Sequence, residues 1–561
     1  MNIRSSAGYN LLHYSMALVV GCASLYLFFF KQINNGFSYI FGDKYDAVIE
    51  SVLVSHWYHV LGFTQAWNQP LYFYPYPDVL GYNDGYFLYG LIGAAYRVMG
   101  FDIFHAQALV HVTVKALGFV SMLILLNRLN GKSIINALGA ALFTLAINSS
   151  VQAVHGQMLA IAFSPLLTVL LIGGVQAAVV GARKAFLLYG LVFVSLLNSL
   201  LITAYYSAWF FGLFAIVYVV AYAVMDREAV KKYIRAMYRL KLQALIIGAW
   251  FVATVIPFLY VYLPKLKQTG GQSYGNQLTY SLHLVDLMNY GSGSLLWGWF
   301  TNLINGSFPN LMRLGEYSVG YTPDILLVMS FVVYSLRANK PRMPVWAKVL
   351  AAAVLVSTAL PISVGGHSLW FFVRALVPGA AGLRTISRYY LFLAFPVAIL
   401  ISVYFERLGG FIRNGRLVGA MALALLCVGQ INLAAPTYLD VPREMAIVEP
   451  VGKAPGGCAS FYVSNPVSPE KSRVDRIYRQ NVQAMLLADK VNIPTLNGLA
   501  TFNPPDWIFV QDGGYLQRVS EYVARHKLKG VCRYDFSGRR WYVHAPDDVA
   551  LMHSGLLGRW R

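Results

Sequence analysis

Five carboxylates are concentrated in one segment of this sequence, between residues 39 and 84. They are Asp43, Asp46, Glu50, Asp78 and Asp84, in a chain in which only 12% of residues are charged. Asp46 and Glu50 are four residues apart, so they share one face of a predicted helix, and Asp43 lies just before it. A carboxylate in this position can act as a general base that removes a proton from an acceptor hydroxyl during displacement at a sugar carbon.

Two other roles are open for these acids. Acidic residues at the start of a helix interact favourably with its dipole, so Asp43 and Asp46 would then cap an interfacial helix. A pair of carboxylates can also hold a divalent cation, Mg²⁺ or Mn²⁺, against a phosphate. His56 and His59, three residues apart, would join such a metal site or simply pack among the neighbouring aromatic residues.

A second group of candidates lies in the basic segment of residues 365–388. His367, Arg374, Arg384 and Arg388 are four potential cations there. The planar guanidinium group suits phosphate, and the phosphate or pyrophosphate of a lipid carrier is the expected partner. The alternatives are salt bridges to the acids of the first segment and snorkelling of the arginines at the membrane surface.

The composition indicates a polytopic α-helical membrane protein. Of the 561 residues, 57% are hydrophobic, the mean hydropathy is +0.53, and apolar runs of spanning length recur along the chain. The formal net charge of +20 is attributed to Lys and Arg in the loops between spans, so nucleic acid is not an expected partner. The partner that the composition predicts is the lipid bilayer.

We expect about eleven transmembrane helices, with the amino terminus in the cytoplasm because Arg4 precedes the first span. The predicted spans are residues 11–30, 107–127, 134–149, 157–180, 185–201, 206–225, 243–263, 323–336, 345–363, 389–406 and 417–435. Residues 1–435 would thus form a transmembrane module. Residues 436–561 are predicted to form a small external α+β domain.

Two long external loops are expected within the transmembrane module, at about residues 31–106 and 265–321. The first contains two stretches with helical apolar spacing, residues 45–62 and 85–100. The second stretch is too short to span, so we predict that both lie at the interface, with Tyr86, Tyr89 and Tyr96 at head-group depth.

Other predicted sites are spread along the external side. Cys458 and Cys532 lie at predicted strands of the tail, so a disulfide is expected if the compartment is oxidising. In the tail, Asn497 and Trp507 would suit sugar recognition, although a turn explains the same residues. Further candidates for substrate contact are Glu50, His56, His59, Asp84, His155, Tyr205, Tyr206 and Glu316.

With these features, the chain resembles the GT-C class of integral-membrane glycosyltransferases. The resemblance covers the whole length in architecture, and its motifs are GDKYD at residues 42–46, GEYSVGY at 315–321 and PGAAGLRTISRYY at 378–390. It implies a polyprenyl-phosphate sugar donor, an inverting transfer of a hexose or pentose, and a base in the first external loop. Asp43 then matches the base, Asp46 its partner, and Arg384 or Arg388 the contact to the donor phosphate.

The resemblance also implies a location, the bacterial inner membrane with the tail in the periplasm, and an acceptor in the cell envelope. That acceptor is a glycan, a lipid or a protein. The acids here are spaced D-x-x-D, whereas many members of the class have adjacent acids or D-x-D, so the identity of the base and the role of a metal stay open. A transporter of lipid-linked glycans and a non-catalytic assembly protein are the alternative functions.

Overall fold

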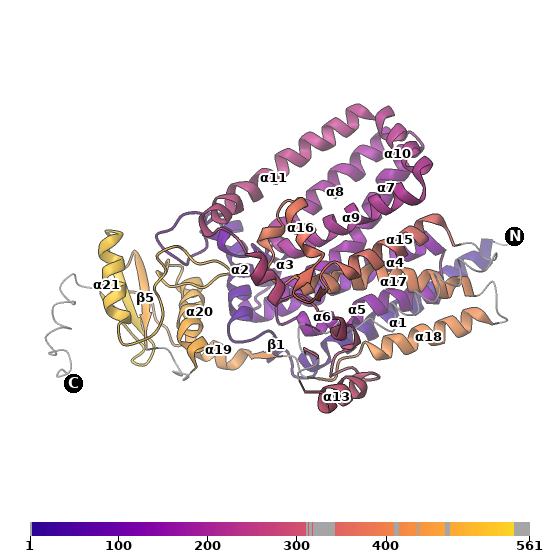
Figure 1. Ribbon diagram of the computed structural model, residues 1–561. Coiled ribbons are helices and arrows are strands. Elements are labelled where there is room, and N and C mark those ends of the chain that lie inside the picture. Colours follow the sequence, from indigo (N-terminus) through magenta and orange to yellow (C-terminus); the bar gives the residue numbers. More distant parts are fainter. Residues whose placement is uncertain are drawn as a thin grey trace. The chain divides into compact units, whose positions relative to one another are not determined.

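The computed structural model describes residues 3–309, 312–313, 317, 343–408, 414–434, 437–465 and 472–543, and it is mostly helical (Figure 1). The chain forms two compact units. Unit 1 comprises Met1–Asn34, His111–Pro257 and Gly271–Pro436, and unit 2 comprises Asn35–Val110, Phe258–Gly270 and Thr437–Arg561. The chain enters unit 2 for the last time at Thr437, one residue after the predicted start of the tail at residue 436. The predicted first external loop shares unit 2 with the tail.

Among the described residues, eight segments are long and apolar enough to cross a membrane, which makes the chain a multi-pass membrane protein. They are Leu11–Asn34, Ile103–Asn130, Ile134–Gln152, Gly156–Val179, Arg183–Thr203, Tyr205–Met225, Lys241–Thr269 and Ile386–Arg407. The sequence predicts three more. Two of them, 345–363 and 417–435, correspond to shorter apolar helices, and the third, 323–336, lies outside the described residues.

Unit 1 is a bundle whose central helix is α17 (Tyr389–Leu408), packed against α5, α15 and α18 (Figure 1). An 18-residue window of the span Ile386–Arg407, which includes most of α17, is completely buried. A Cβ at Gly139 of α5 would lie 1.9 Å from Ser402 Oγ of α17, so the glycine permits this close approach. The other helices of the bundle are α1 (Ile3–Asn34), most of α4 (Ile103–Asn130), α5 (Ile134–Leu145), α6 (Ile147–Gln152), α7 (Ser164–Val179), α8 (Arg183–Thr203), α9 (Tyr205–Met225), α10 (Arg227–Arg239), the first part of α11 (Lys241–Thr269), α12 (Tyr274–Thr279), α13 (Gly298–Ser307), α15 (Val345–Ala359), α16 (Trp370–Leu376) and α18 (Gly415–Gly429).

Unit 2 joins the segment after the first span to the tail. Strand β1 (Tyr39–Phe41) pairs antiparallel with β4 (Tyr438–Asp440), with Ile40 opposite Leu439. Helix α2 (Asp46–Leu61) then packs against α3 (Phe87–Val98) and against α20 (Arg473–Val491) of the tail. The remaining elements of the tail are α19 (Val441–Val448), β5 (Ser460–Ser464), α21 (Tyr515–Arg525), β6 (Val531–Asp535) and β7 (Arg540–Val543).

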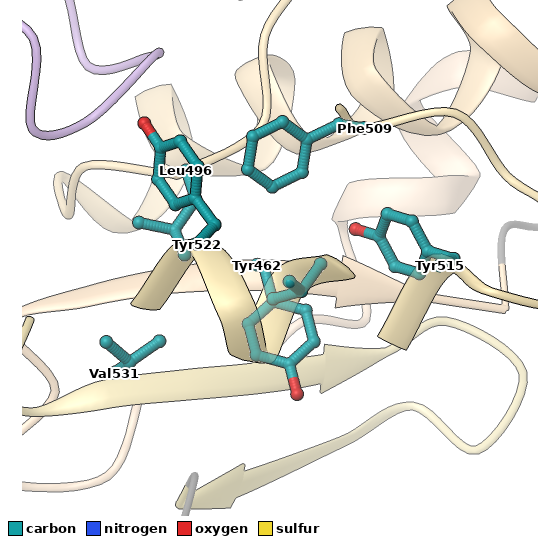
Figure 2. Close-up of a cluster of buried hydrophobic side chains, with 7 residues drawn as sticks. Tyr462, Leu496, Phe509, Tyr515, Tyr522 and Val531 are labelled. Carbon is teal, nitrogen blue, oxygen red and sulfur yellow. The ribbon is translucent and has the colours of Figure 1, made fainter. Parts of the chain in front are cut away.

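The tail contains a three-stranded mixed sheet in which β5 is parallel to β6 and β6 is antiparallel to β7. Its hydrophobic core lies between this sheet and α21 and consists of Tyr462, Leu496, Phe509, Tyr515, Val519, Tyr522 and Val531 (Figure 2). Asn497 is fully buried, and its side-chain amide bonds Asn481 at 2.9 Å and Tyr515 at 3.1 Å. The suggested role of Asn497 in sugar recognition is therefore wrong, because the side chain holds this core together.

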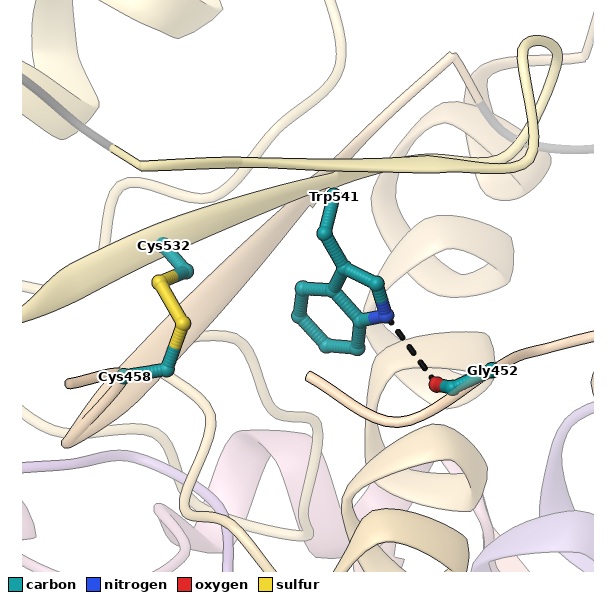
Figure 3. Close-up of a disulfide and its surroundings, with 4 residues drawn as sticks. All are labelled: Gly452, Cys458, Cys532 and Trp541. Carbon is teal, nitrogen blue, oxygen red and sulfur yellow. Dashed lines mark hydrogen bonds between the residues drawn. A yellow bond between two sulfur atoms is a disulfide. The ribbon is translucent and has the colours of Figure 1, made fainter. Parts of the chain in front are cut away.

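Cys458 and Cys532, the pair expected from the sequence, form a disulfide with Cα atoms 5.6 Å apart (Figure 3). The bridge closes the β5–β6 pair near the start of both strands. Close by, the Trp541 indole N–H donates a hydrogen bond of 3.2 Å to the Gly452 carbonyl, which holds β7 against the chain before β5.

Replacement of both cysteines by serine is expected to destabilise unit 2 by about 2–4 kcal/mol, because the bridge closes a long loop in the unfolded chain. The measurement is thermal melting of the purified protein followed by tryptophan fluorescence, with Cys22→Ser as the matched control. Equal melting temperatures for the double variant and wild type would contradict this expectation.

Candidate functional site

Asp43 caps the start of α2. Its Oδ1 accepts hydrogen bonds from the backbone N–H of Tyr45 at 2.9 Å and of Asp46 at 2.7 Å. It thereby satisfies two of the backbone donors that the first turn of a helix leaves without a helical partner. The capping role that the sequence offers as an alternative is thus present in the structure. A catalytic role for the same carboxylate stays a proposal.

Asp46, Glu50 and Asp84, here called the carboxylate cluster, lie around two buried tyrosines. Glu50 is buried, whereas Asp46 and Asp84 are half-buried. Burial raises the pKa of Tyr86 and Tyr89 well above the usual value, and the nearby charges of Glu50 and Asp84 raise it further. Both phenols therefore stay protonated at neutral pH and provide hydrogen-bond donors beside these acids.

Close packing of α3 on α2 positions this cluster. The Trp57 indole N–H of α2 donates to the Gly85 carbonyl at 2.7 Å, which fixes the chain between Asp84 and α3. A Cβ at Gly90 would lie 2.1 Å from the Trp57 ring, so only glycine allows this approach. Tyr86 and Tyr89 pack inside unit 2, so their side chains are not available to contact lipid head groups as an aromatic belt would.

The start of α2 is anchored on α20 by Asp475. Lys44 Nζ lies 2.9 Å from Asp475 Oδ1, and the Tyr45 hydroxyl donates to the same oxygen. Burial, followed by this hydrogen bond, raises the pKa of Tyr45 to about 12. Sequence analysis did not identify Asp475, because no local pattern links two residues 430 positions apart.

His56 and His59 have structural partners in unit 2. His56 is buried, and its two ring nitrogens lie 2.7 Å from Gln65 Oε1 and 3.1 Å from the Trp67 carbonyl. Burial lowers the pKa of His56. His59 Nε2 lies 3.3 Å from Asp489 Oδ1. These contacts favour the packing alternative for both histidines.

The residues that the structure describes contain no group of three or more His, Cys, Asp or Glu side chains able to hold a metal ion. The Mg²⁺ or Mn²⁺ that the sequence leaves open therefore has no defined ligand set in this part of the chain. We assign no step of the chemistry below to a metal.

In unit 1, Arg384 and Arg388 lie in a compact turn just before α17, here called the arginine turn (residues 379–388). The Tyr206 hydroxyl accepts hydrogen bonds from the backbone N–H of Arg384 at 2.8 Å and of Thr385 at 3.0 Å. The Arg388 guanidinium lies 5.5 Å from the centre of the Tyr206 ring, and that of Arg384 lies 5.3 Å from the Tyr280 ring. Arg388 is buried and Arg384 is exposed. The turn thus fixes two cations beside aromatic rings.

Arg374 is linked to the same turn through one buried glutamine. Its Nη1 donates to Gln277 Oε1 at 3.2 Å, and Gln277 Nε2 donates to the carbonyls of Ala380 and Leu383, each at 2.7 Å. His367 instead lies exposed in the short hairpin of β2 (Ser363–Val364) and β3 (His367–Ser368). Arg374, Arg384 and Arg388 therefore belong to one network, whereas His367 is placed on a separate hairpin.

The other predicted contact residues of unit 1 have varied surroundings. The Tyr205 hydroxyl donates to the Gly379 carbonyl at 2.9 Å, so Tyr205 and Tyr206 both support the arginine turn. His155 is half-buried at the turn that follows α6. Glu316, in the motif at residues 315–321, lies outside the described residues.

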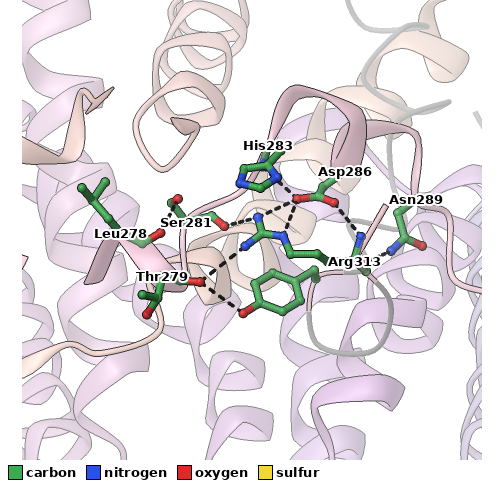
Figure 4. A network of polar contacts seen from close by, with 8 residues as sticks. Leu278, Thr279, Ser281, His283, Asp286, Asn289 and Arg313 are labelled. Carbon is green, nitrogen blue, oxygen red and sulfur yellow. Dashed lines mark hydrogen bonds and ion pairs between the residues drawn. The ribbon is translucent and has the colours of Figure 1, made fainter. Parts of the chain in front are cut away.

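A further polar network in unit 1 centres on Asp286 and Arg313 (Figure 4). Asp286 is fully buried, and its Oδ2 accepts from Arg313 Nε at 3.1 Å and Nη2 at 2.7 Å, and from the His283 backbone N–H at 2.8 Å. The Arg313 guanidinium also lies 4.1 Å from the centre of the Tyr317 ring. Sequence analysis missed this pair, because both residues are isolated charges in a long polar loop.

No family model matches this sequence, and no curated protein matches it. Among solved structures, ArnT from Cupriavidus metallidurans in the apo state is similar, with 12% identity and a TM-score of 0.39 over 98% of this chain and 95% of that chain. ArnT from the same organism bound to undecaprenyl phosphate is similar with 13% identity and a TM-score of 0.33, over 87% of this chain and 85% of that chain. TM-scores of this size do not establish a common fold.

Proposed function

We propose that the protein is a membrane glycosyltransferase that moves a sugar from a polyprenyl-phosphate-linked donor to a cell-envelope acceptor. The observation that carries the proposal is the group of acids beside α2, which comprises Asp43 before the helix and the carboxylate cluster. Such a set of carboxylates at a membrane protein's non-spanning surface supplies the base that glycosyl transfer requires. The transferred sugar is a hexose or a pentose, and the acceptor is a glycan, a lipid or a protein.

In this proposal, Asp43 or Asp46 removes the proton from the acceptor hydroxyl. The acceptor oxygen then forms a bond to the anomeric carbon as the bond from that carbon to the phosphate oxygen breaks, which inverts the anomeric centre. The polyprenyl phosphate leaves with the negative charge. Arg384 and Arg388 bind that phosphate, because guanidinium groups donate charge-assisted hydrogen bonds to phosphate oxygens.

We place the protein in the bacterial inner membrane, with residues 436–561 in the periplasm. The disulfide between Cys458 and Cys532 supports an oxidising compartment for the tail. The expected partners are the lipid bilayer, the donor lipid and the envelope acceptor.

The test is an assay of the full chain in nanodiscs with a mixed extract of polyprenyl-phosphate sugars and envelope acceptors. Mass spectrometry follows the loss of each donor lipid and the release of polyprenyl phosphate. We expect one donor to be consumed in proportion to enzyme. Binding of a donor without turnover would favour a transporter of lipid-linked glycans, and neither binding nor turnover would favour a non-catalytic assembly protein.

Replacement of Arg388 or Arg384 by methionine is expected to raise the Kd for the donor lipid about 10- to 100-fold. This change corresponds to the free energy that one hydrogen bond to a charged group usually contributes to binding. The turn should persist in the Arg384 variant, because Tyr206 bonds the backbone of residues 384 and 385. The control is Arg416→Met, since the Arg416 side chain is 75% exposed and lies 3.5 Å from Glu406. A Kd that both variants leave unchanged would remove the arginine turn from the proposal.

A further inference from the structure

Lys115 is a buried lysine inside a membrane span, and the proposed reaction does not use it. It lies near the middle of α4 and is only 5% exposed. Its Nζ donates to Ser149 Oγ at 3.1 Å and lies 4.1 Å from the centre of the Phe28 ring. An ammonium group has three donors, and among the described residues Lys115 has this one hydrogen-bond acceptor and no carboxylate partner.

A lysine in this setting needs an explanation. Removing an ammonium group from water costs several kcal/mol unless an anion and further hydrogen bonds compensate for it. Ionisable residues inside membrane spans are accordingly rare and mark binding sites or pathways. A hydroxyl and an aromatic ring supply only part of that compensation, and a bound anion would supply the rest.

Helix α1 provides a second buried polar group, close in sequence to Phe28. Gln32 is 1% exposed, and neither its Oε1 nor its Nε2 has a hydrogen-bond partner among the described residues. It lies four residues after Phe28, just past a kink at Phe29, where the backbone of α1 departs from helical geometry. A buried amide without partners is costly, and a polar ligand at this place would satisfy it.

The register of α1 against α4 supports this placement. His13 Nε2 lies 3.2 Å from Asn127 Nδ2, and a Cβ at Gly21 would lie 2.7 Å from the Phe119 ring. Together with the contact of Phe28 to Lys115, these pairs show that the two helices run antiparallel. Continued past the kink at Phe29, this register brings Gln32 to about the level of His111, one turn from Lys115, where the His111 side chain is also buried.

We propose that Lys115, Ser149 and Gln32 form a binding site for the phosphate group of an amphiphilic ligand within unit 1. All three side chains offer N–H or O–H donors, which suits phosphate oxygens. The site lies inside a membrane span, so a phosphate attached to an apolar chain fits it better than a free ion. This inference does not depend on which reaction the protein catalyses.

The test compares binding of farnesyl phosphate, farnesol and inorganic phosphate to the full chain in detergent, by native mass spectrometry. Wild type is expected to bind farnesyl phosphate and not farnesol. Lys115→Met is expected to weaken that binding about 10- to 100-fold, and Ser149→Ala or Gln32→Leu to weaken it less. Lys132→Met is the matched control, because Lys132 also lies over an aromatic ring, 4.6 Å from that of Tyr14, but follows the end of α4.

Three results would overturn the inference. They are equal affinity of wild type and the Lys115 variant for farnesyl phosphate, equal binding of farnesol, and no further loss of affinity when Lys115→Met is added to Arg388→Met, whose own effect belongs to the arginine turn. Binding of inorganic phosphate as tight as that of farnesyl phosphate would overturn the assignment to an amphiphile. Thermal melting shows whether each variant is folded, and Lys115→Arg, which keeps the charge, is expected to retain binding. Donor turnover is measured separately, so a failure here leaves the proposed reaction untouched.

Discussion

Asp43→Asn is expected to lower the turnover number for donor consumption by about 10²- to 10⁴-fold, the usual contribution of a general base. Asparagine keeps the Oδ1 acceptor that bonds the N–H groups of Tyr45 and Asp46, so the start of α2 should persist. An amide cannot take up the acceptor's proton. Donor affinity should therefore stay near that of wild type while turnover is lost. The measurement is steady-state donor consumption in nanodiscs beside a separate binding titration.

The structure supplies a matched control for this substitution. Asp102 Oδ1 accepts from the backbone N–H of Phe104 at 2.9 Å and of His105 at 3.0 Å, the same capping geometry at the start of α4. Asp102→Asn should leave turnover unchanged. Asp46→Asn, measured in parallel, tests the second candidate base. Wild-type turnover in both the Asp43 and the Asp46 variants would show that neither residue is the base.

Local pattern predicted those parts of the structure that depend on neighbouring residues. The acids before α2 indicated a capped helix, and Asp43 caps it. The apolar stretch around α3 was too short to span a membrane, and α3 has only 12 residues. The spacing of acids on α2 placed Asp46 and Glu50 on one face, and both contribute charge near Tyr86.

Contacts between residues far apart in the sequence could not be predicted from local patterns. Tyr206 fixes the backbone of Arg384 across 178 positions, and Tyr45 bonds Asp475 across 430. Neither pair leaves a spacing that a single sequence reveals. The burial of Tyr89 depends in the same way on the close approach of α3 to α2 at Gly90, which only the packed structure shows.

Arg479→Met is expected to destabilise unit 2 by about 3–5 kcal/mol, because it leaves a buried carboxylate without its partner. Arg479 and Glu444 are 4% and 2% exposed, and they form two hydrogen bonds of 2.8 and 3.0 Å between α20 and α19. Arg479 Nη1 also donates to the Lys44 carbonyl at 3.2 Å, just before α2. Loss of the arginine should therefore also loosen the segment that carries Asp43.

The double variant Arg479→Met, Glu444→Met separates the two causes of this effect. Replacement of both partners of a buried ion pair by apolar residues is often neutral or stabilising, so the double variant should regain most of the stability lost in the single one. In the double variant the Lys44 carbonyl still lacks the hydrogen bond from Arg479, so the segment that carries Asp43 stays loosened. Turnover should therefore recover less completely than the melting temperature. Thermal melting and donor consumption, measured on the same preparations, report the two quantities independently. A double variant as unstable as Arg479→Met alone would show that packing of the arginine side chain, rather than the unpaired charge of Glu444, dominates.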